Sequence, residues 1–254
     1  MDKTYRGYIG GVMTNLFDIH CHIIPGVDDG PKDMKTAMQL LQMEYEDGVR
    51  SIIVTPHFRK GMFETSQETI LKHFLLLKES ASEAYPNMNL YLGCEFHANM
   101  DMIDTLETKK RPTMADSPYV LVEFSEDDSL SYIRERCYML LCNRYIPVIA
   151  HAERYAALYR QYDAIAQLVD MGAQIQIGAS SIVGENGFIM KKFCKKLMKM
   201  DLLHYVGSDA HNLTDRKPCM GKCAAYMQKM MGRAYTRRIM NRNPACFIGH
   251  GIRD

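Results

Sequence analysis

The stretch Leu16-Phe17-Asp18-Ile19-His20-Cys21-His22 joins a strand-length apolar run, Leu16–Ile19, to two histidines separated by a single residue. Alternate residues of an extended strand point in the same direction, so the two imidazoles can bind one metal ion. Six further runs of similar length follow along the chain, at Ser51–Val54, Asn89–Leu92, Tyr119–Val122, Ile146–Ile149, Gln174–Ile177 and His204–Val206. Together these runs predict seven β-strands.

The segments between the runs carry apolar residues at steps of three and four, which is typical of amphipathic helices. The expected buried faces are Met34/Met38/Leu41/Tyr45, Ile70/Phe74/Leu77/Ala81, Ile133/Cys137/Leu140/Leu141 and Ile189/Phe193/Leu197/Met200. Strands that alternate with helices at intervals of about 30 to 40 residues form a parallel sheet. A closed or nearly closed β/α barrel and an open doubly wound sheet both fit this pattern. However, neither GxGxxG nor GxxxxGK[ST] occurs in the sequence.

Length and composition favour one large α/β domain over residues 1–254, with Met1–Thr14 as an N-terminal arm. The net charge of +1 gives no reason to expect binding to nucleic acid or to an anionic membrane. No apolar run is long enough to cross a bilayer, and the first residues do not resemble a secretory signal, so we expect a cytoplasmic protein. The eight cysteines form no C-x2-C zinc pattern and are expected to be small buried residues in a reducing compartment.

Side chains that bind metals follow six of the seven runs. They are His20 and His22 after the first run, then His57, Glu95, Glu123 and His151, and finally Asp209 and His211 after the seventh. In a β/α barrel the C-terminal ends of all strands meet at one face, so these residues should converge. One His-x-His pair can arise by chance, and Asp209 alone could cap a helix. Six strand ends with the same property instead predict a metal centre.

Imidazole and carboxylate ligands together suit zinc, manganese and iron, and the set is too large for one tetrahedral ion. Two or three ions that share a bridging carboxylate would use all of these ligands. Arg154 and Arg216 lie close to ligands in the sequence, and guanidinium groups bind phosphate oxygens well. Any single arginine is more often a surface residue. The lysines of the segment 191–199 lie largely opposite its apolar stripe and are interpreted as a solvated face.

These motifs resemble those of the polymerase-and-histidinol-phosphatase (PHP) superfamily. Within it the chain is similar to the bacterial manganese-dependent protein-tyrosine phosphatases of capsule and exopolysaccharide operons. The superfamily pattern is the His-x-His opening, the mid-chain Glu and His, and the closing Ser-Asp-Ala-His. The narrower resemblance runs from about Leu16 to about Pro244. It is carried by Asp18–Ile23, Val27-Asp28-Asp29-Gly30-Pro31, Lys60–Thr65, Val148–Tyr155 and Ser208–Leu213.

The resemblance implies a distorted seven-stranded (β/α) TIM-like barrel of PHP type that holds two to three manganese ions, with iron or zinc as alternatives. It implies a first ion held by His20, His22, Glu95 and Asp209. Glu95 would bridge to a second ion completed by Glu123 and His151, and a third ion would be held by Asp29, His57 and His211. Asp29 enters only through the resemblance, since it does not follow a strand. Arg154 and Arg216 would bind the phosphoryl group.

The residues and the resemblance agree on phosphomonoester hydrolysis. No cysteine is followed six positions later by an arginine, so the thiolate mechanism of the common tyrosine phosphatases is not available. The expected substrate is phosphotyrosine on a protein, and the resemblance points to the tail of a membrane-anchored bacterial tyrosine kinase. A histidinol phosphatase or another small-molecule phosphatase on the same barrel is the alternative. The third hypothesis is a scaffold protein that binds metal for stability and has no catalytic activity.

Overall fold

The computed structural model describes residues 8–9 and 12–249, and each of the seven predicted runs forms a strand. These strands are β3 (Leu16–Cys21), β4 (Val49–Val54), β6 (Asn89–Leu92), β8 (Tyr119–Glu123), β9 (Ile146–Ile149), β10 (Gln174–Gly178) and β11 (Tyr205–Gly207). Two short strands, β5 (His57–Phe58) and β7 (Glu95–His97), follow β4 and β6 after breaks of two residues. The breaks place His57 and Glu95 at the C-terminal side of the sheet.

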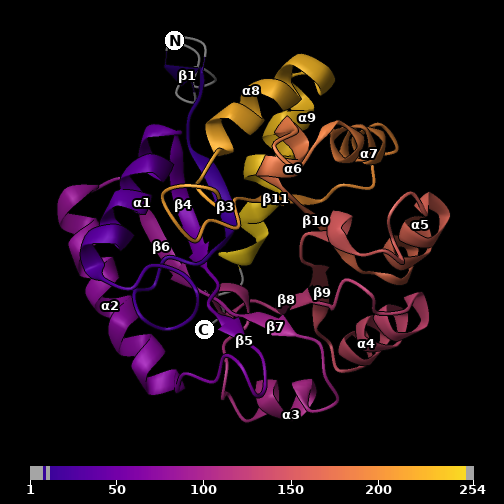
Figure 1. Ribbon diagram of the computed structural model, residues 1–254, viewed down its shortest axis with the longest axis horizontal. Coiled ribbons are helices and arrows are strands. Elements are labelled where there is room, and N and C mark those ends of the chain that lie inside the picture. The colour runs from indigo at the N-terminus through magenta and orange to yellow at the C-terminus, as the bar shows by residue number, and fades with distance from the viewer. Residues whose placement is uncertain (1–7, 10–11, 250–254) are drawn as a thin grey trace.

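The strands form a curled parallel half-barrel, which confirms an α/β fold with a parallel sheet (Figure 1). One sheet has the order β3-β4-β6 and the other the order β11-β10-β9-β8-β7-β5. The last and first strands meet where the Asp209 N–H donates to the His20 carbonyl (2.8 Å) and the His22 N–H donates to the Ala210 carbonyl (2.9 Å). The predicted count of seven barrel strands is not confirmed, because the strands divide between two sheets and two of them are interrupted.

Helices surround the strands in an outer layer (Figure 1). The first helix begins after Asp33, whose carboxylate accepts a hydrogen bond from the Thr36 N–H. The α-helices are α1 (Met34–Glu46), α2 (Gln67–Ala84), α3 (Met102–Glu107), α4 (Leu130–Cys142), α5 (Tyr162–Met171), α6 (Ala179–Val183), α7 (Phe188–Lys199), α8 (Met220–Met231) and α9 (Arg233–Arg237). The 3-10 and π turns are η2 (Met114–Asp116), η3 (Ala152–Arg154), η4 (Arg238–Arg242) and η5 (Pro244–Phe247).

Two hydrophobic clusters hold these layers together. The larger one lies between the strands and the surrounding helices, and the smaller one is formed by inward-facing strand residues such as Phe17, Ile19 and Leu121. Phe247 of η5 joins the smaller cluster, and its ring lies 4.9 Å from the rings of Tyr119 and Tyr205. The C-terminal segment therefore packs against the inner cluster.

The predicted buried helix faces are correct for some helices and wrong for others. On α2 the buried residues are the four predicted ones, and α4 buries the predicted Ile133, Cys137 and Leu140. On α1 the centre of the face is shifted, because Ala37, Leu40 and Glu44 are buried while Met34 and Met38 are only partly covered. On α7 both ends of the predicted stripe are wrong. Ile189 is exposed in the first turn of the helix, and Met200, which is also exposed, lies one residue beyond the end of the helix.

All eight cysteines are free thiols, and six of them are buried as predicted. The prediction is wrong for Cys142, which is exposed, and Cys246 is only partly buried. The predicted N-terminal arm is described only in part. Strand β1 (Tyr8–Ile9) pairs antiparallel with β2 (Val12–Met13), and residues 1–7 and 10–11 of the arm lie outside the described residues. In the part of the chain that the structure describes, no helix has the length and apolar character needed to span a membrane.

Glu44 of α1 is completely buried beside Asp18 of β3. Burial, and then the charge of Asp18, raise the pKa of Glu44 well above its usual range. The folded protein therefore keeps a proton that the unfolded chain releases, and its free energy of unfolding falls as the pH rises above the ordinary glutamate pKa. Glutamine stays neutral in both states, so its contribution does not depend on pH in this way. Relative to the natural chain, the free energy of unfolding of Glu44→Gln should therefore increase by about 1–3 kcal/mol between pH 5 and pH 8. Urea unfolding at both pH values, with chelator present throughout, measures this gain. If the variant and the natural chain differed in stability by the same amount at pH 5 and at pH 8, Glu44 would not be neutral in the folded protein.

Candidate metal centre

The nine predicted ligands come from separate parts of the chain and meet at the C-terminal side of the strands. His20 and His22 lie at the end of β3, while β5, β7 and β8 supply His57, Glu95 and Glu123. The segments after β9 and β11 supply His151, Asp209 and His211, and Asp29 comes from the loop between β3 and α1. His151 and Asp209 both have positive φ angles, 30° and 54°, which residues other than glycine rarely adopt. Such backbone conformations are often found at functional sites.

Glu95 is the centre of the cluster, and its carboxylate is completely buried. Its Oε2 atom lies 3.1 Å from Nε2 of His20, 3.1 Å from Nε2 of His22 and 3.0 Å from Nδ1 of His57. The other oxygen, Oε1, lies 3.0 Å from Nε2 of His151. One carboxylate thus contacts four imidazoles, which is the arrangement expected of a residue that bridges two ions.

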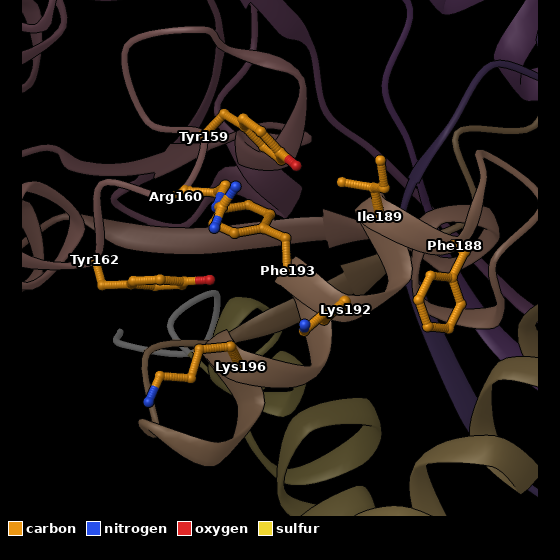
Figure 2. A pocket seen from close by; sticks show the side chains of 8 residues that line it. All are labelled: Tyr159, Arg160, Tyr162, Phe188, Ile189, Lys192, Phe193 and Lys196. Atoms are coloured by element: carbon orange, nitrogen blue, oxygen red, sulfur yellow. The ribbon is translucent and has the colours of Figure 1, made fainter.

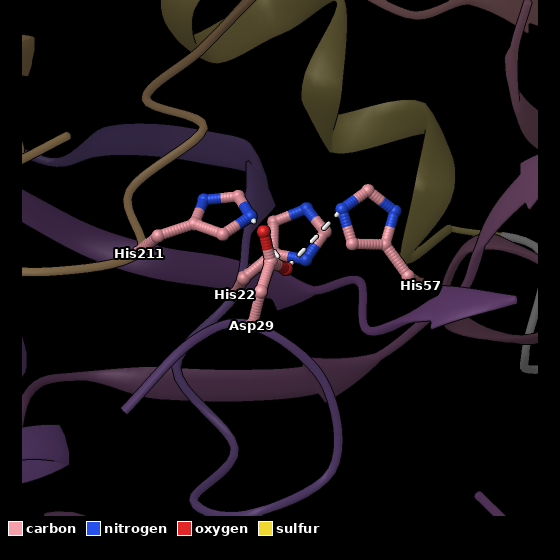
Figure 3. Close-up of side chains that lie close together, drawn as sticks. All are labelled: His22, Asp29, His57 and His211. Atoms are coloured by element: carbon pink, nitrogen blue, oxygen red, sulfur yellow. Dashed lines mark ion pairs between the residues drawn. The ribbon is translucent and has the colours of Figure 1, made fainter. Parts of the chain in front are cut away.

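A second group surrounds Asp29 at the outer edge of the site (Figure 3). The Oδ1 atom of Asp29 lies 3.3 Å from Nε2 of His211 and 3.5 Å from Nε2 of His57. The rings of His22 and His211 are stacked with centroids 4.0 Å apart. His57 has one ring nitrogen toward Asp29 and the other toward Glu95, so it connects the two groups. On the far side, Nε2 of His151 lies 3.6 Å from Oε1 of Glu123.

Two unsatisfied buried atoms test whether these residues fit a metal ion. Among the described residues, neither Oε2 of Glu95 nor Nε2 of His211 has a hydrogen-bond partner. Three imidazole nitrogens approach the Glu95 oxygen within about 3 Å without the geometry of hydrogen-bond donors. Buried polar atoms without partners are costly, and a cation at their centre would satisfy both kinds of lone pair. The donor set therefore fits a metal ion.

The pKa values of the cluster show how much positive charge it requires. Burial lowers the pKa of His20 and His57, but the charge of Glu95 outweighs it and raises both to about 9. Burial and the Glu95 charge raise the pKa of Glu123 to about 7. Burial also opposes ionisation of Asp209, but the positive charges of His20 and a neighbouring arginine hold its pKa well below the usual range. Burial lowers the pKa of His151 and of His211 to about 4, so these two imidazoles stay neutral. Without metal, protons on His20 and His57 offset part of the carboxylate charge, and a metal ion would take over this role.

The two predicted arginines contact the carboxylates of the same cluster. Arg154 donates to Oδ2 of Asp209 (2.6 Å), and Arg216 donates to Oδ1 of Asp209 and Oδ2 of Asp29 (3.2 Å each). The side chains of Arg154, Arg216 and Asp29 are 31%, 36% and 41% exposed, whereas those of His20, His22 and Glu95 are buried. The cluster is therefore open to solvent on its arginine side and closed on its strand side.

Several positioning residues were missed by the sequence analysis. Asp28 Oδ2 lies 2.9 Å from Nδ1 of His22 and accepts the backbone N–H of His57 (3.1 Å). The Gln176 side-chain oxygen accepts the His151 N–H and lies 3.3 Å from Nδ1 of His20. Only the acidic pair Asp28-Asp29 gave a signal in the sequence, since Gln176 sits inside an ordinary strand.

Asp18 and Ser208 join the first strand to the segment after the last one. The Asp18 carboxylate accepts hydrogen bonds from the Ser208 N–H (2.9 Å), the Ser208 hydroxyl (2.6 Å) and the His20 N–H (3.2 Å). These bonds fix the backbone beside His20 and beside Asp209. Asp18 thus orients the backbone beside two predicted ligands of the first ion and is not one of the predicted ligands itself.

The fold and the site define a TIM-barrel-like α/β protein with a candidate metal centre at the C-terminal ends of its strands. The chain belongs to the CpsB/CapC family of capsular polysaccharide synthesis, whose model matches residues 16–249.

The relatives agree in name and in fold. Tyrosine-protein phosphatase CpsB of Streptococcus pneumoniae is 38% identical over 92% of this chain and 98% of its own length. Tyrosine-protein phosphatase YwqE of Bacillus subtilis is 31% identical over 79% of both chains. A crystal structure from a study of these two metal-dependent tyrosine phosphatases matches with a TM-score of 0.86 and 27% identity, covering 93% of this chain and 96% of that one. The phosphotriesterase homology protein of Escherichia coli shares the fold, with a TM-score of 0.61 and 13% identity over 92% and 99% of the two chains.

Asp28 provides a test of the metal centre that leaves every predicted ligand in place. Residues that orient a metal ligand typically contribute about 10- to 100-fold to metal affinity. We expect Asp28→Ala to weaken manganese binding by that factor, because His22 loses the partner of its second ring nitrogen. Titration calorimetry on chelator-treated protein measures the affinity, and Asp170→Ala, which removes an exposed carboxylate near the C-terminal end of α5, is the control. Equal affinities for the two variants would contradict the role of Asp28.

Proposed function

We propose that this chain is a metal-dependent phosphatase that hydrolyses phosphotyrosine on proteins. The observation that supports this most directly is the Glu95 carboxylate with its four imidazole contacts, in a chain that belongs to the CpsB/CapC family. Relatives named tyrosine-protein phosphatases match over most of the chain, which supports the substrate class.

The ligand groups are those that the family resemblance implies, and the contacts of Glu95, Asp209 and Asp29 with the surrounding histidines support them. His20, His22, Glu95 and Asp209 would hold one ion, and Glu95, Glu123 and His151 a second. Asp29, His57 and His211 would hold a third. We propose manganese, with iron or zinc as alternatives, because the donors are imidazoles and carboxylates without a thiolate. When bound, the ions supply Lewis acidity to the phosphoryl group and activate the attacking water.

Arg154 and Arg216 would bind the phosphoryl oxygens. Each arginine already has its guanidinium beside Asp209, and each remains partly exposed on the open side of the cluster. A guanidinium can donate to two oxygens at once, so both side chains can hold a phosphate while they keep a contact with Asp209. They would also stabilise the charge that develops on the equatorial oxygens in the transition state.

The open edge of the site suits the side chain of a peptide. Phe63 stacks on His57 with centroids 4.9 Å apart and an interplanar angle of 12°, and Met62 beside it is exposed. This apolar edge, next to an exposed Asp29, could contact the phenol ring or the flanking chain of a substrate. The leaving phenolate has a conjugate-acid pKa near 10, so it needs less help from a general acid than an alkoxide does. The open edge is the observation that favours this function over a small-molecule phosphatase.

The natural partner, location and domain organisation belong to the same proposal. We infer that the substrate is the tyrosine-rich tail of a bacterial tyrosine kinase that controls capsule or exopolysaccharide synthesis, and that the enzyme acts in the cytoplasm. We also infer that the chain works as one domain of seven strand positions, with β5 and β7 as continuations of β4 and β6. The parallel pairing of β5 with β7 supports this count.

The arginine contribution can be measured directly. We expect Arg216→Ala to lower kcat/KM for a phosphotyrosine peptide by about 1–3 kcal/mol, the scale of a lost charge-assisted hydrogen bond. Steady-state kinetics with manganese supplied measures this effect. Arg233→Ala, which changes an arginine of the distant helix α9, is the matched control. If Arg216→Ala kept the kcat/KM of the natural chain, Arg216 would not be part of the phosphate site.

The substrate class is tested by comparing turnover of a phosphotyrosine peptide with turnover of histidinol phosphate. We expect efficient hydrolysis of the peptide, no turnover in excess chelator, and complete loss in His22→Ala and Asp209→Ala. Both variants should remain folded, because these side chains lie at strand ends. Efficient hydrolysis of histidinol phosphate with none of the peptide would favour the small-molecule alternative.

A further inference from the structure

We propose that a second pocket, between the start of α5 and one side of α7, binds another phosphotyrosine of the same substrate chain. This inference rests on the proposed function and extends it. The pocket has a volume of about 400 Å³, which is within the usual range of small-ligand sites (Figure 2). It shares no residue with the candidate metal centre, and the function described above does not use it.

Aromatic rings form the wall of this pocket. Phe193 is buried, and its ring lies 5.3 Å from the ring of Tyr159 and 5.6 Å from that of Tyr162. Phe188 and Ile189 of α7 line the opposite side and are 79% and 67% exposed. The sequence had predicted Ile189 as part of a buried stripe, and the structure instead leaves it uncovered. A phenyl ring between these residues would cover apolar surface that nothing else in the described chain covers.

Cations stand around the same aromatic wall. Arg160, Lys192 and Lys196 are exposed and line the pocket. None of the ion pairs formed within residues 8–9 and 12–249 involves these three side chains. An aromatic wall with three unpaired cations is complementary to a ligand that is both aromatic and anionic, and phosphotyrosine has this chemistry. A lipid bilayer is the weaker match, because the rings line a concavity that a flat surface does not enter.

The position of the pocket connects it with the metal centre. Helix α5 comes after β9, and α7 comes after β10 and the short helix α6. The first residues of α5 and α7 therefore lie at the C-terminal side of the strands, where the metal ligands also gather. Arg154 of the site and Arg160 of the pocket belong to one connection and are six residues apart. Six residues span at most about 20 Å. A flexible peptide could therefore place one phosphotyrosine at the metals and another, several residues away, in the pocket.

The test uses two peptides that carry one hydrolysable phosphotyrosine. In the first, a neighbouring tyrosine about six residues away is unmodified, and in the second it is replaced by a non-hydrolysable difluorophosphonate analogue. We expect the second peptide to have a KM about tenfold lower, an effect that Lys192→Ala/Lys196→Ala abolishes while leaving the first peptide unchanged. Lys195→Ala/Lys199→Ala is the matched control, since it removes two charges from the same helix outside this pocket. It should retain the effect.

Binding without turnover separates this proposal from the proposed function. Fluorescence anisotropy on chelator-treated protein, with a peptide carrying only the analogue, should show binding that Lys192→Ala/Lys196→Ala weakens by about tenfold. This binding is expected even if neither peptide is hydrolysed, an outcome that would count only against the proposed function. Equal KM values for the two peptides, or equal losses in both double variants, would overturn the proposal. Binding of anionic phosphatidylglycerol vesicles through Lys192 and Lys196, without peptide binding, would also overturn it in favour of a membrane surface.

Discussion

The buried carboxylate of Glu95 is the constraint on which the site depends. A charge in the interior of a protein is costly unless opposite charge surrounds it, and four imidazoles meet this carboxylate at about 3 Å. The imidazoles come from β3, β5 and the segment after β9, so the charge is balanced only when the curled sheet brings these strands together. Fold and site are coupled at this residue. The break in the third strand at 93–94 matters because it places Glu95 on that face.

Much of the architecture could be predicted from the sequence, because the strands are short apolar runs and six of the seven are followed by a predicted ligand. The seven runs and the buried face of α2 follow from periodicity alone. The convergence of His20, Glu95 and Asp209 follows from the rule that parallel strands share one C-terminal face. Asp29 could be found only through family resemblance, since it lies in a loop where no period places a side chain.

Other features could not be predicted because they depend on neighbours distant in the sequence. Periodicity identifies an apolar face on α7 but cannot say whether another element covers Ile189 at its end. The roles of Asp28 and Gln176 depend on the positions of imidazole nitrogens rather than on any motif. The interruptions that create β5 and β7 are also tertiary, and they are the reason why the strand count differs from a simple barrel.

Metal ions in the space between Glu95 and the surrounding histidines would balance the charge of this buried carboxylate. Anomalous X-ray diffraction from crystals grown with manganese, collected on both sides of the manganese absorption edge, tests this metal occupancy most directly. We expect at least two anomalous peaks, one of them between Glu95, His20 and His22 and another beside Glu123 and His151. An electron-density map without such peaks, in which the histidines only hydrogen-bond to the carboxylates, would contradict metal occupancy of this space.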